Sequence, residues 1–147
     1  MDRPTRQAGF TLIELMVVLV IVGIASAAIS LSIRDDPGKT LRADAQRLAQ
    51  VLQVAHSQVQ ADGRSLRWQA DSDGYRFLRG AQVVQDDGPL RPQRWQAAPV
   101  SVRLEPNQVL RVSGEWLGEP MRVLLTSGQQ QVEVLRDAKG QVQVRQP

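Results

Sequence analysis

A run of 24 residues from Phe10 to Ile33 carries a single charged side chain, Glu14, and this run constrains the chain more than any other feature. As a helix rising about 1.5 Å per residue it would be roughly 36 Å long, more than the ~30 Å hydrocarbon core of a bilayer. Apolar residues occupy every face of such a helix, which is not the pattern of a helix packed against a globular core. The run therefore predicts a membrane-spanning helix.

The flanks of this run predict its orientation. Arg3 and Arg6 precede it, whereas Arg34 follows it and is joined by Asp35 and Asp36. Because lysine and arginine collect on the cytoplasmic side of membrane helices, we expect a short cytoplasmic N-terminus and a C-terminal part across the membrane. The run is too long for a secretory signal, and no Ala-x-Ala cleavage site follows it closely.

Glu14 is costly in this setting, because an acid at the centre of a span costs about 2.5–3.5 kcal/mol on insertion scales. No basic residue lies within the run. A cut between Gly9 and Phe10 would create an α-amino group four residues from Glu14. In a bundle, this amine could meet the carboxylate of a neighbouring subunit and fix its register, because either charge is penalised when left alone in a desolvated site. Alternatively, Glu14 reaches the lipid headgroups.

The segment "RQAGFTLIELMVVLVIVGI" (6–24) resembles the leader and N-terminal helix of type IV pilins and type II secretion pseudopilins. The resemblance implies that a prepilin peptidase cleaves after Gly9, that the new N-terminal Phe10 is methylated, and that Glu14 directs assembly into a filament. Many members of that family have a proline midway through this helix, whereas "ASAAISLSI" (25–33) has none.

Composition argues against several kinds of site. The chain has no cysteine, which excludes a disulfide framework and a thiolate metal site. Its one histidine, His56, is too few for a histidine-based metal site or a catalytic triad. Acidic pairs adjoin proline or glycine, and Asp71 and Asp73 lack the later acid that an EF-hand requires. We therefore expect no enzyme, no cofactor and no metal site.

A second helix is predicted after the composition break "RDDPGKT" (34–40), where Thr40 could cap its start. Steps of three and four give one apolar stripe, which predicts an amphipathic helix over about 40–61 that ends near Asp62 and Gly63. The stripe comprises Leu41, Ala45, Leu48, Leu52, Ala55 and Val59. We place Asp44 and Arg47 on its solvated face and His56 beside the stripe as a partly exposed residue.

From residue 65 the apolar period changes to two, which indicates strands. Expected strands cover 65–69, 75–79, 81–85, 100–104, 108–113 and 121–126, with a terminal hairpin over 130–145. The proline-containing segment 86–99 is expected to be a loop anchored by Trp95. A long helix followed by short antiparallel strands is an α+β pattern, in which the second half of the helix packs on the sheet. The expected domains are a leader (1–9), a transmembrane assembly helix (10–33) and a globular domain (34–147).

The segments "AAPVSVRLEPNQVL" (97–110) and "EPMRVLLTSGQQQVEVLRDAKGQVQV" (119–144) are similar to the H-type minor pseudopilins of type II secretion. This resemblance implies a pilin-like fold and a subunit at or near the tip of a pseudopilus that supports export of folded proteins. Implied partners are the prepilin peptidase, other major and minor pseudopilins, the inner-membrane secretion platform and the lipid bilayer. The implied location is the bacterial inner membrane, with one span and a periplasmic C-terminal domain. The alternative is a minor type IV pilin for pilus assembly or DNA uptake.

The DNA-uptake alternative draws on Arg67, Arg76 and Arg79, which alternate with Trp68, Tyr75 and Phe77. Arginine and aromatic residues bind nucleic acid when they share a face. In strands, however, alternate residues point to opposite faces, so the aromatics are expected in the core and the arginines in solvent. This pattern disfavours a nucleic-acid partner.

Overall fold

The computed structural model describes residues 11–32, 36–85, 87–106, 109–115 and 120–147, with the side chains of 29–32 left out. The chain divides into two compact units, residues 1–35 and 36–147. Each is described by itself.

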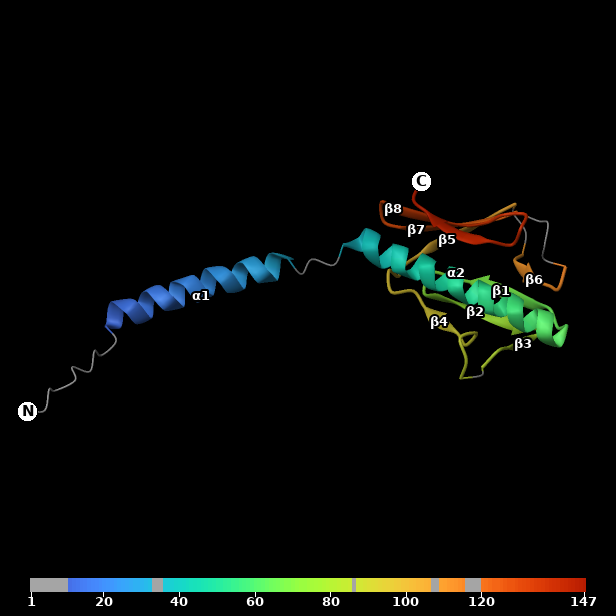
Figure 1. Cartoon of the computed structure of the whole chain (residues 1–147), viewed down its shortest axis with the longest axis horizontal. Helices are drawn as coiled ribbons and strands as arrows, with labels where there is room; N and C mark the ends of the chain where they lie inside the picture. Colours follow the sequence, from blue (N-terminus) through green and yellow to red (C-terminus); the bar gives the residue numbers. More distant parts are fainter. Residues whose placement is uncertain (1–10, 33–35, 86, 107–108, 116–119) are drawn as a thin grey trace, which may run out of the picture. The chain divides into compact units, whose positions relative to one another are not determined.

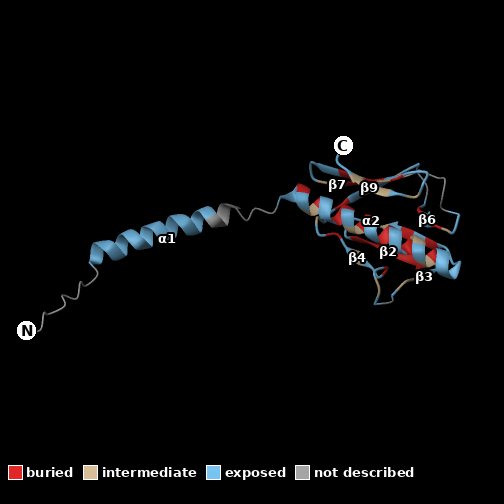
Figure 2. Ribbon diagram, in the orientation of Figure 1, coloured by how far each residue is buried: buried red, intermediate tan, exposed pale blue. Residues whose placement is uncertain are grey.

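The first unit contains one helix, α1 (Leu12–Ser32). Every side chain described in it is exposed, as the pale blue colour in Figure 2 shows. Among the residues that the structure describes, no helix combines the length and the hydropathy needed to cross a membrane.

The second unit begins with α2 (Pro37–Asp62), which runs three residues further toward the N-terminus than the sequence predicts. Its cap is Asp36, whose Oδ1 accepts a hydrogen bond from the N–H of Gly38 at 3.0 Å. The expectation that Thr40 caps the helix is wrong, because proline fits the first helical position, where its missing N–H has no partner to lose. At the other end, Gly63 adopts φ 69° and donates its N–H to the carbonyl of Val59 at 2.8 Å, as the sequence predicts.

The predicted apolar stripe of α2 is buried in full. His56 is half-buried, which agrees with its expected place beside the stripe. Asp44 contradicts the prediction, since its side chain is buried and not on the solvated face. Its Oδ2 accepts a hydrogen bond from the N–H of Ala97 at 2.9 Å, so a loop covers this position of the helix.

One antiparallel sheet has its strands in the order β3–β2–β1–β6, with β4 also paired to β2. The expected hairpin is present, because Trp68 of β1 lies opposite Phe77 of β2. The segment expected to be all loop contains β4, which pairs with the start of β2. The strands are β1 (Leu66–Ala70), β2 (Gly74–Arg79), β3 (Gln82–Val83), β4 (Gln93–Arg94) and β6 (Arg111–Val112).

The second antiparallel sheet has the order β5–β7–β8–β9, so β5 and β9 are its edges. Its strands are β5 (Ser101–Glu105), β7 (Met121–Ser127), β8 (Gln130–Arg136) and β9 (Val142–Arg145). The terminal hairpin forms as predicted, with Asp137 Oδ1 accepting the N–H groups of Lys139 and Gln141 in its turn. Figure 1 shows both sheets beside α2.

The core lies between α2 and the two sheets and contains the apolar stripe together with Trp68, Tyr75 and Phe77. Trp95 anchors its loop as predicted. Its indole N–H donates to the carbonyl of Asp71 at 3.0 Å, and its ring centroid lies 4.8 Å from that of Tyr75. The α+β architecture predicted from the sequence is confirmed.

Candidate assembly site and candidate binding surfaces

Glu14 lies in the first turn of α1, where Thr11 caps the helix. The hydroxyl of Thr11 accepts a hydrogen bond from the N–H of Glu14 at 3.4 Å, and its carbonyl accepts the N–H of Leu15 at 3.2 Å. Threonine at the cap with glutamate three residues later is the sequence of a capping box. This signal for the start of the helix was not used in the sequence analysis, and the observed bond involves the backbone of Glu14 and not its carboxylate.

The surroundings of Glu14 are apolar and exposed. Leu12, Ile13 and Leu15 are 78%, 71% and 58% exposed. A carboxylate in such a surface can be paired only by a group from outside the helix or from its N-terminal side. The predicted processing residues, Gly9 and Phe10, lie outside the residues that the structure describes.

The structure does not bring Arg67, Arg76 and Arg79 together. Arg76 donates to the side chain of Gln69 at 3.4 Å on the face of the sheet that Arg67 shares. Arg79 alternates onto the other face and pairs with Asp62, at the end of α2, at 3.1 Å.

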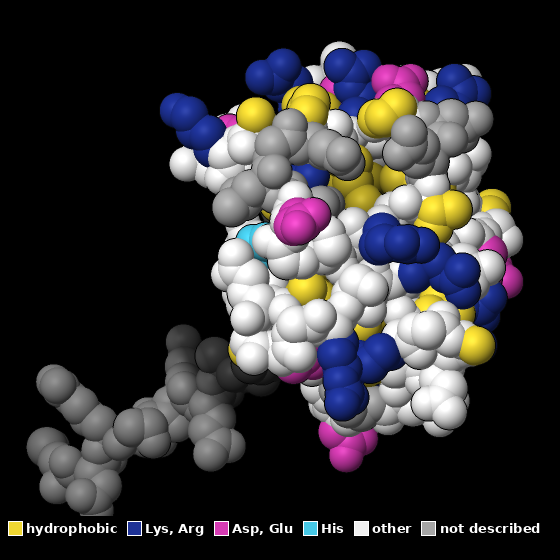
Figure 3. Space-filling model, turned by 90° about the vertical axis from the view of Figure 1, so that its right-hand side faces the viewer, with side chains coloured by type: hydrophobic (Ala, Val, Ile, Leu, Met, Phe, Trp, Pro, Cys, Tyr) yellow, Lys and Arg dark blue, Asp and Glu magenta, His cyan; other side chains and the backbone are white. Residues whose placement is uncertain are grey.

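The aromatic residues between these arginines are buried, as the alternation predicts. They are therefore not available to stack on bases. On the face in Figure 3 the basic side chains form separate groups and not one continuous track. Neither observation favours a nucleic-acid surface.

The segment that faintly resembles a calcium loop is a hairpin turn. Asp71 Oδ1 accepts the N–H groups of Asp73 and Gly74, each at 3.0 Å. These two hydrogen bonds, with a smaller effect of Arg76, hold the pKa of Asp71 below its ordinary value against a small desolvation effect. Within the described ranges, no group of three acidic, histidine or cysteine side chains is arranged to hold a metal ion.

Comparison with known proteins bears on both units. Residues 4–30 match the family model described as "Prokaryotic N-terminal methylation motif". A solved structure, the type IV minor pilin FimU of Pseudomonas aeruginosa, shares the fold with a TM-score of 0.53 at 19% identity, over 71% of this chain and 87% of that one. The motif match and the shared fold both agree with the resemblance to type IV pilins found in the sequence.

A curated relative is the "Type II secretion system protein H" of Aeromonas hydrophila. It is 30% identical over 96 residues, which cover 65% of this chain and 48% of the relative. The chain thus spans about half the length of that relative. Neither of these two proteins is named as an enzyme, in agreement with the expectation from the sequence.

Proposed function

We propose that this chain is a minor pseudopilin, a structural subunit at or near the tip of a type II secretion pseudopilus. The observation that carries the proposal is the 96-residue similarity to a type II secretion system protein H. That similarity is longer than the 35 residues of the first unit, so most of it falls in the globular unit. The motif alone would support only membership of the wider superfamily.

In this proposal the chain is made as a precursor. Prepilin peptidase cleaves it after Gly9, and the new N-terminal Phe10 is methylated. The methylation-motif match over residues 4–30 supports this processing, because it spans the leader, the cleavage position and the start of the apolar run.

The same run anchors the subunit in the bacterial inner membrane before assembly, with the N-terminus cytoplasmic and residues 34–147 periplasmic. The 24-residue run extends at both ends beyond the side chains that the structure describes, so this step rests on the sequence. The inner-membrane secretion platform then moves the subunit into the filament.

Assembly places α1 in a bundle of apolar helices from other major and minor pseudopilins. Support comes from the exposure of its described large apolar side chains, which are 48–78% exposed. Glu14 meets the amine of a neighbouring subunit there. A lone charge in such a bundle is penalised, so only a correctly registered subunit is retained.

A strain in which the chromosomal copy is deleted tests the function. We expect the exported proteins to accumulate in the periplasm and the intact chain to restore their release. Normal release without the chain, together with loss of surface pili, would replace this proposal by the alternative of a minor type IV pilin. The fold shared with FimU is the observation that favours this alternative.

A further inference from the structure

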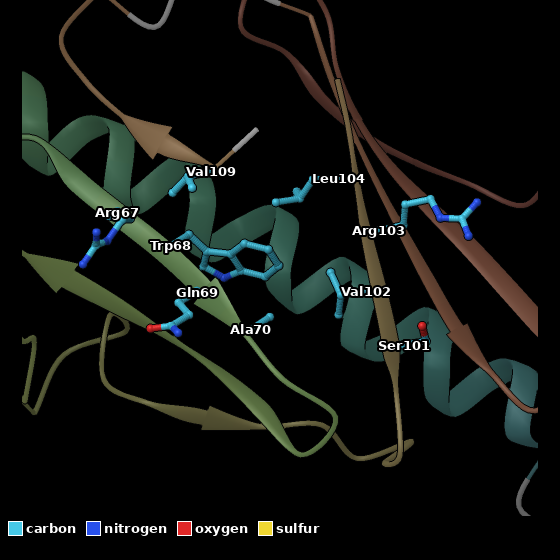
Figure 4. A pocket seen from close by; sticks show the side chains of 9 residues that line it. All are labelled: Arg67, Trp68, Gln69, Ala70, Ser101, Val102, Arg103, Leu104 and Val109. Atoms are coloured by element: carbon cyan, nitrogen blue, oxygen red, sulfur yellow. The ribbon is translucent and has the colours of Figure 1, made fainter. Parts of the chain in front are cut away.

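An open groove of about 740 Å³ lies between β1 and β5, that is, between the two sheets. Its apolar lining residues are Trp68, Ala70, Val102, Leu104 and Val109. Figure 4 shows the Trp68 ring in the gap, with Val102 and Leu104 on the side of β5 that faces it. Val102 and Leu104 are half-buried and Val109 is exposed, so this apolar surface is only partly covered.

The backbone along this groove has unused hydrogen-bonding capacity. Within the described part of the chain, β5 pairs with β7 on one side only. The two sheets meet at one end of the groove, where Val100 donates to the carbonyl of Ser72 at 2.9 Å. From that point no described strand pairs with the other edge of β5. Open edges bind extended peptides by strand addition.

The Trp68 side chain supplies an unused donor at the same place. It is 2% exposed, and its indole N–H has no hydrogen-bond acceptor among the described residues. A buried donor without an acceptor costs about 1–3 kcal/mol, so native proteins seldom leave such a donor without a hydrogen bond. The nitrogen has almost no accessible surface as the ring stands, so a main-chain carbonyl entering the groove would satisfy it once the ring turns toward the groove.

The charged side chains that line the groove indicate the charge of the segment that would bind there. Arg67 and Arg103 line the groove but point away from it on either side, and none of its described lining residues is acidic. Neither arginine forms an ion pair with a described residue. In a strand added to β5, residues on the solvent face would lie beside Arg103, where an acidic side chain is a favourable cross-strand neighbour.

We propose that the β1–β5 groove binds an extended segment of another protein, with alternating apolar and acidic residues, which adds to β5 as a new strand. Apolar side chains of that segment fill the hollow against Val102 and Leu104, and a main-chain carbonyl accepts the Trp68 indole N–H. Its acidic side chains lie beside Arg103. The proposal goes beyond the proposed function and holds equally for a secretion or a pilus subunit.

The test uses the full chain in detergent micelles and the blocked peptide acetyl-Thr-Val-Glu-Val-Glu-Val-Thr-amide. We expect saturable binding and slower amide hydrogen exchange at residues 68–70 and 100–105. Val102→Glu should raise the Kd at least about tenfold, because it places a carboxylate in the apolar hollow. Arg103→Glu should weaken binding and Arg145→Glu, the same change on the opposite edge of this sheet, should not.

Two further peptides, N-methylated on alternate sets of amides, separate strand addition from apolar adsorption. Methylation of the N–H groups that face β5 should abolish binding. Methylation of the alternate N–H groups, which point away from β5, should not. Trp68→Phe keeps an aromatic ring but removes the donor, and should also weaken binding. If Val102→Glu fails to fold, Arg103→Glu, a change at an exposed position, and the two methylated peptides still test whether a strand adds to β5.

No binding at 1 mM peptide, or equal binding of both methylated peptides, would overturn the proposal. Protection of β5 that rises with protein concentration in the absence of peptide would also overturn it, because a second copy would then be the occupant.

Discussion

Asp44 on α2 and Ala97 in the loop before β5 are joined by a hydrogen bond of 2.9 Å from the Ala97 N–H to Asp44 Oδ2. The Asp44 side chain is 1% exposed, and its other oxygen lies 3.7 Å from the guanidinium of Arg47. In turn, the Ala97 carbonyl accepts the hydroxyl of Ser127 at 2.7 Å. One residue of the loop thus connects the helix to the second sheet.

Replacing Asp44 by Ala should lower the free energy of unfolding by about 1–3 kcal/mol, because the Ala97 N–H loses its charged acceptor in a buried place. Asp44→Asn keeps an acceptor oxygen and should cost less. Urea denaturation followed by circular dichroism measures both. The exposed neighbour Arg42→Ala serves as control and should stay within about 0.5 kcal/mol of the parent. An Asp44→Ala loss no larger than that of Arg42→Ala would refute the role given to this bond.

Tyr75 should make the globular unit lose stability at high pH. Burial raises its pKa to about 12, with a smaller raising effect of Asp44 and a lowering effect of Arg47. Above pH 10 the unfolded chain loses the phenolic proton while the folded chain keeps it. The free energy of unfolding should therefore fall by about 1.4 kcal/mol per pH unit from pH 10 toward 12.

The chain has one tyrosine, so tyrosinate absorbance reports Tyr75 alone. Tyr75→Phe should remove this part of the pH dependence. At pH 7 it should cost little, because the buried hydroxyl has no hydrogen-bond partner among the described residues. Ionisation of the folded chain at pH 10 would contradict the burial described here.

Gly74→Ala should destabilise the chain by about 1–3 kcal/mol, the usual cost of adding volume to a packed site. A Cβ at this position of β2 would overlap the carbonyl oxygen of Gln93 in β4, the strand paired with the start of β2. Gly114→Ala is the matched control, because a Cβ there meets no described atom within 4 Å. Thermal unfolding of both variants measures the difference, and equal melting temperatures would disprove the close approach.

Glu14→Ala should leave precursor cleavage intact and reduce incorporation into the filament and secretion at least tenfold, because the carboxylate that sets register is missing. Immunoblots of sheared filaments and of the culture medium measure these losses. Thr11→Ala removes the helix cap but keeps the carboxylate. Equal losses of incorporation and secretion in the two variants would show that helix capping alone explains the effect of Glu14→Ala.

The sequence predicted the elements of the globular unit well where its pattern is regular. The α2 stripe and the β1–β2 hairpin have a clear period, and each is set by local spacing. Asp36 was missed as a cap because Pro37, which usually ends a helix, here begins one.

Features that depend on distant contacts were not predictable. The burial of Asp44 depends on Ala97, which is 53 residues away. The β1–β5 groove requires two sheets to meet between Ser72 and Val100, and no local spacing encodes that meeting. For the candidate site, the motif predicts Gly9, Phe10 and Glu14, and their roles stay predictions.

The hydrophobic core, together with the apolar side chains packed at its margin, runs from Leu41 to Val144. The core described for the globular unit (36–147) therefore contains no residue of α1. Natural selection can therefore change α1 without destabilising the globular unit, and the reverse. A lineage could keep a common N-terminal helix while its globular units diversify. A laboratory chimera that joins this globular unit to the N-terminal helix of another subunit should fold as the parent does.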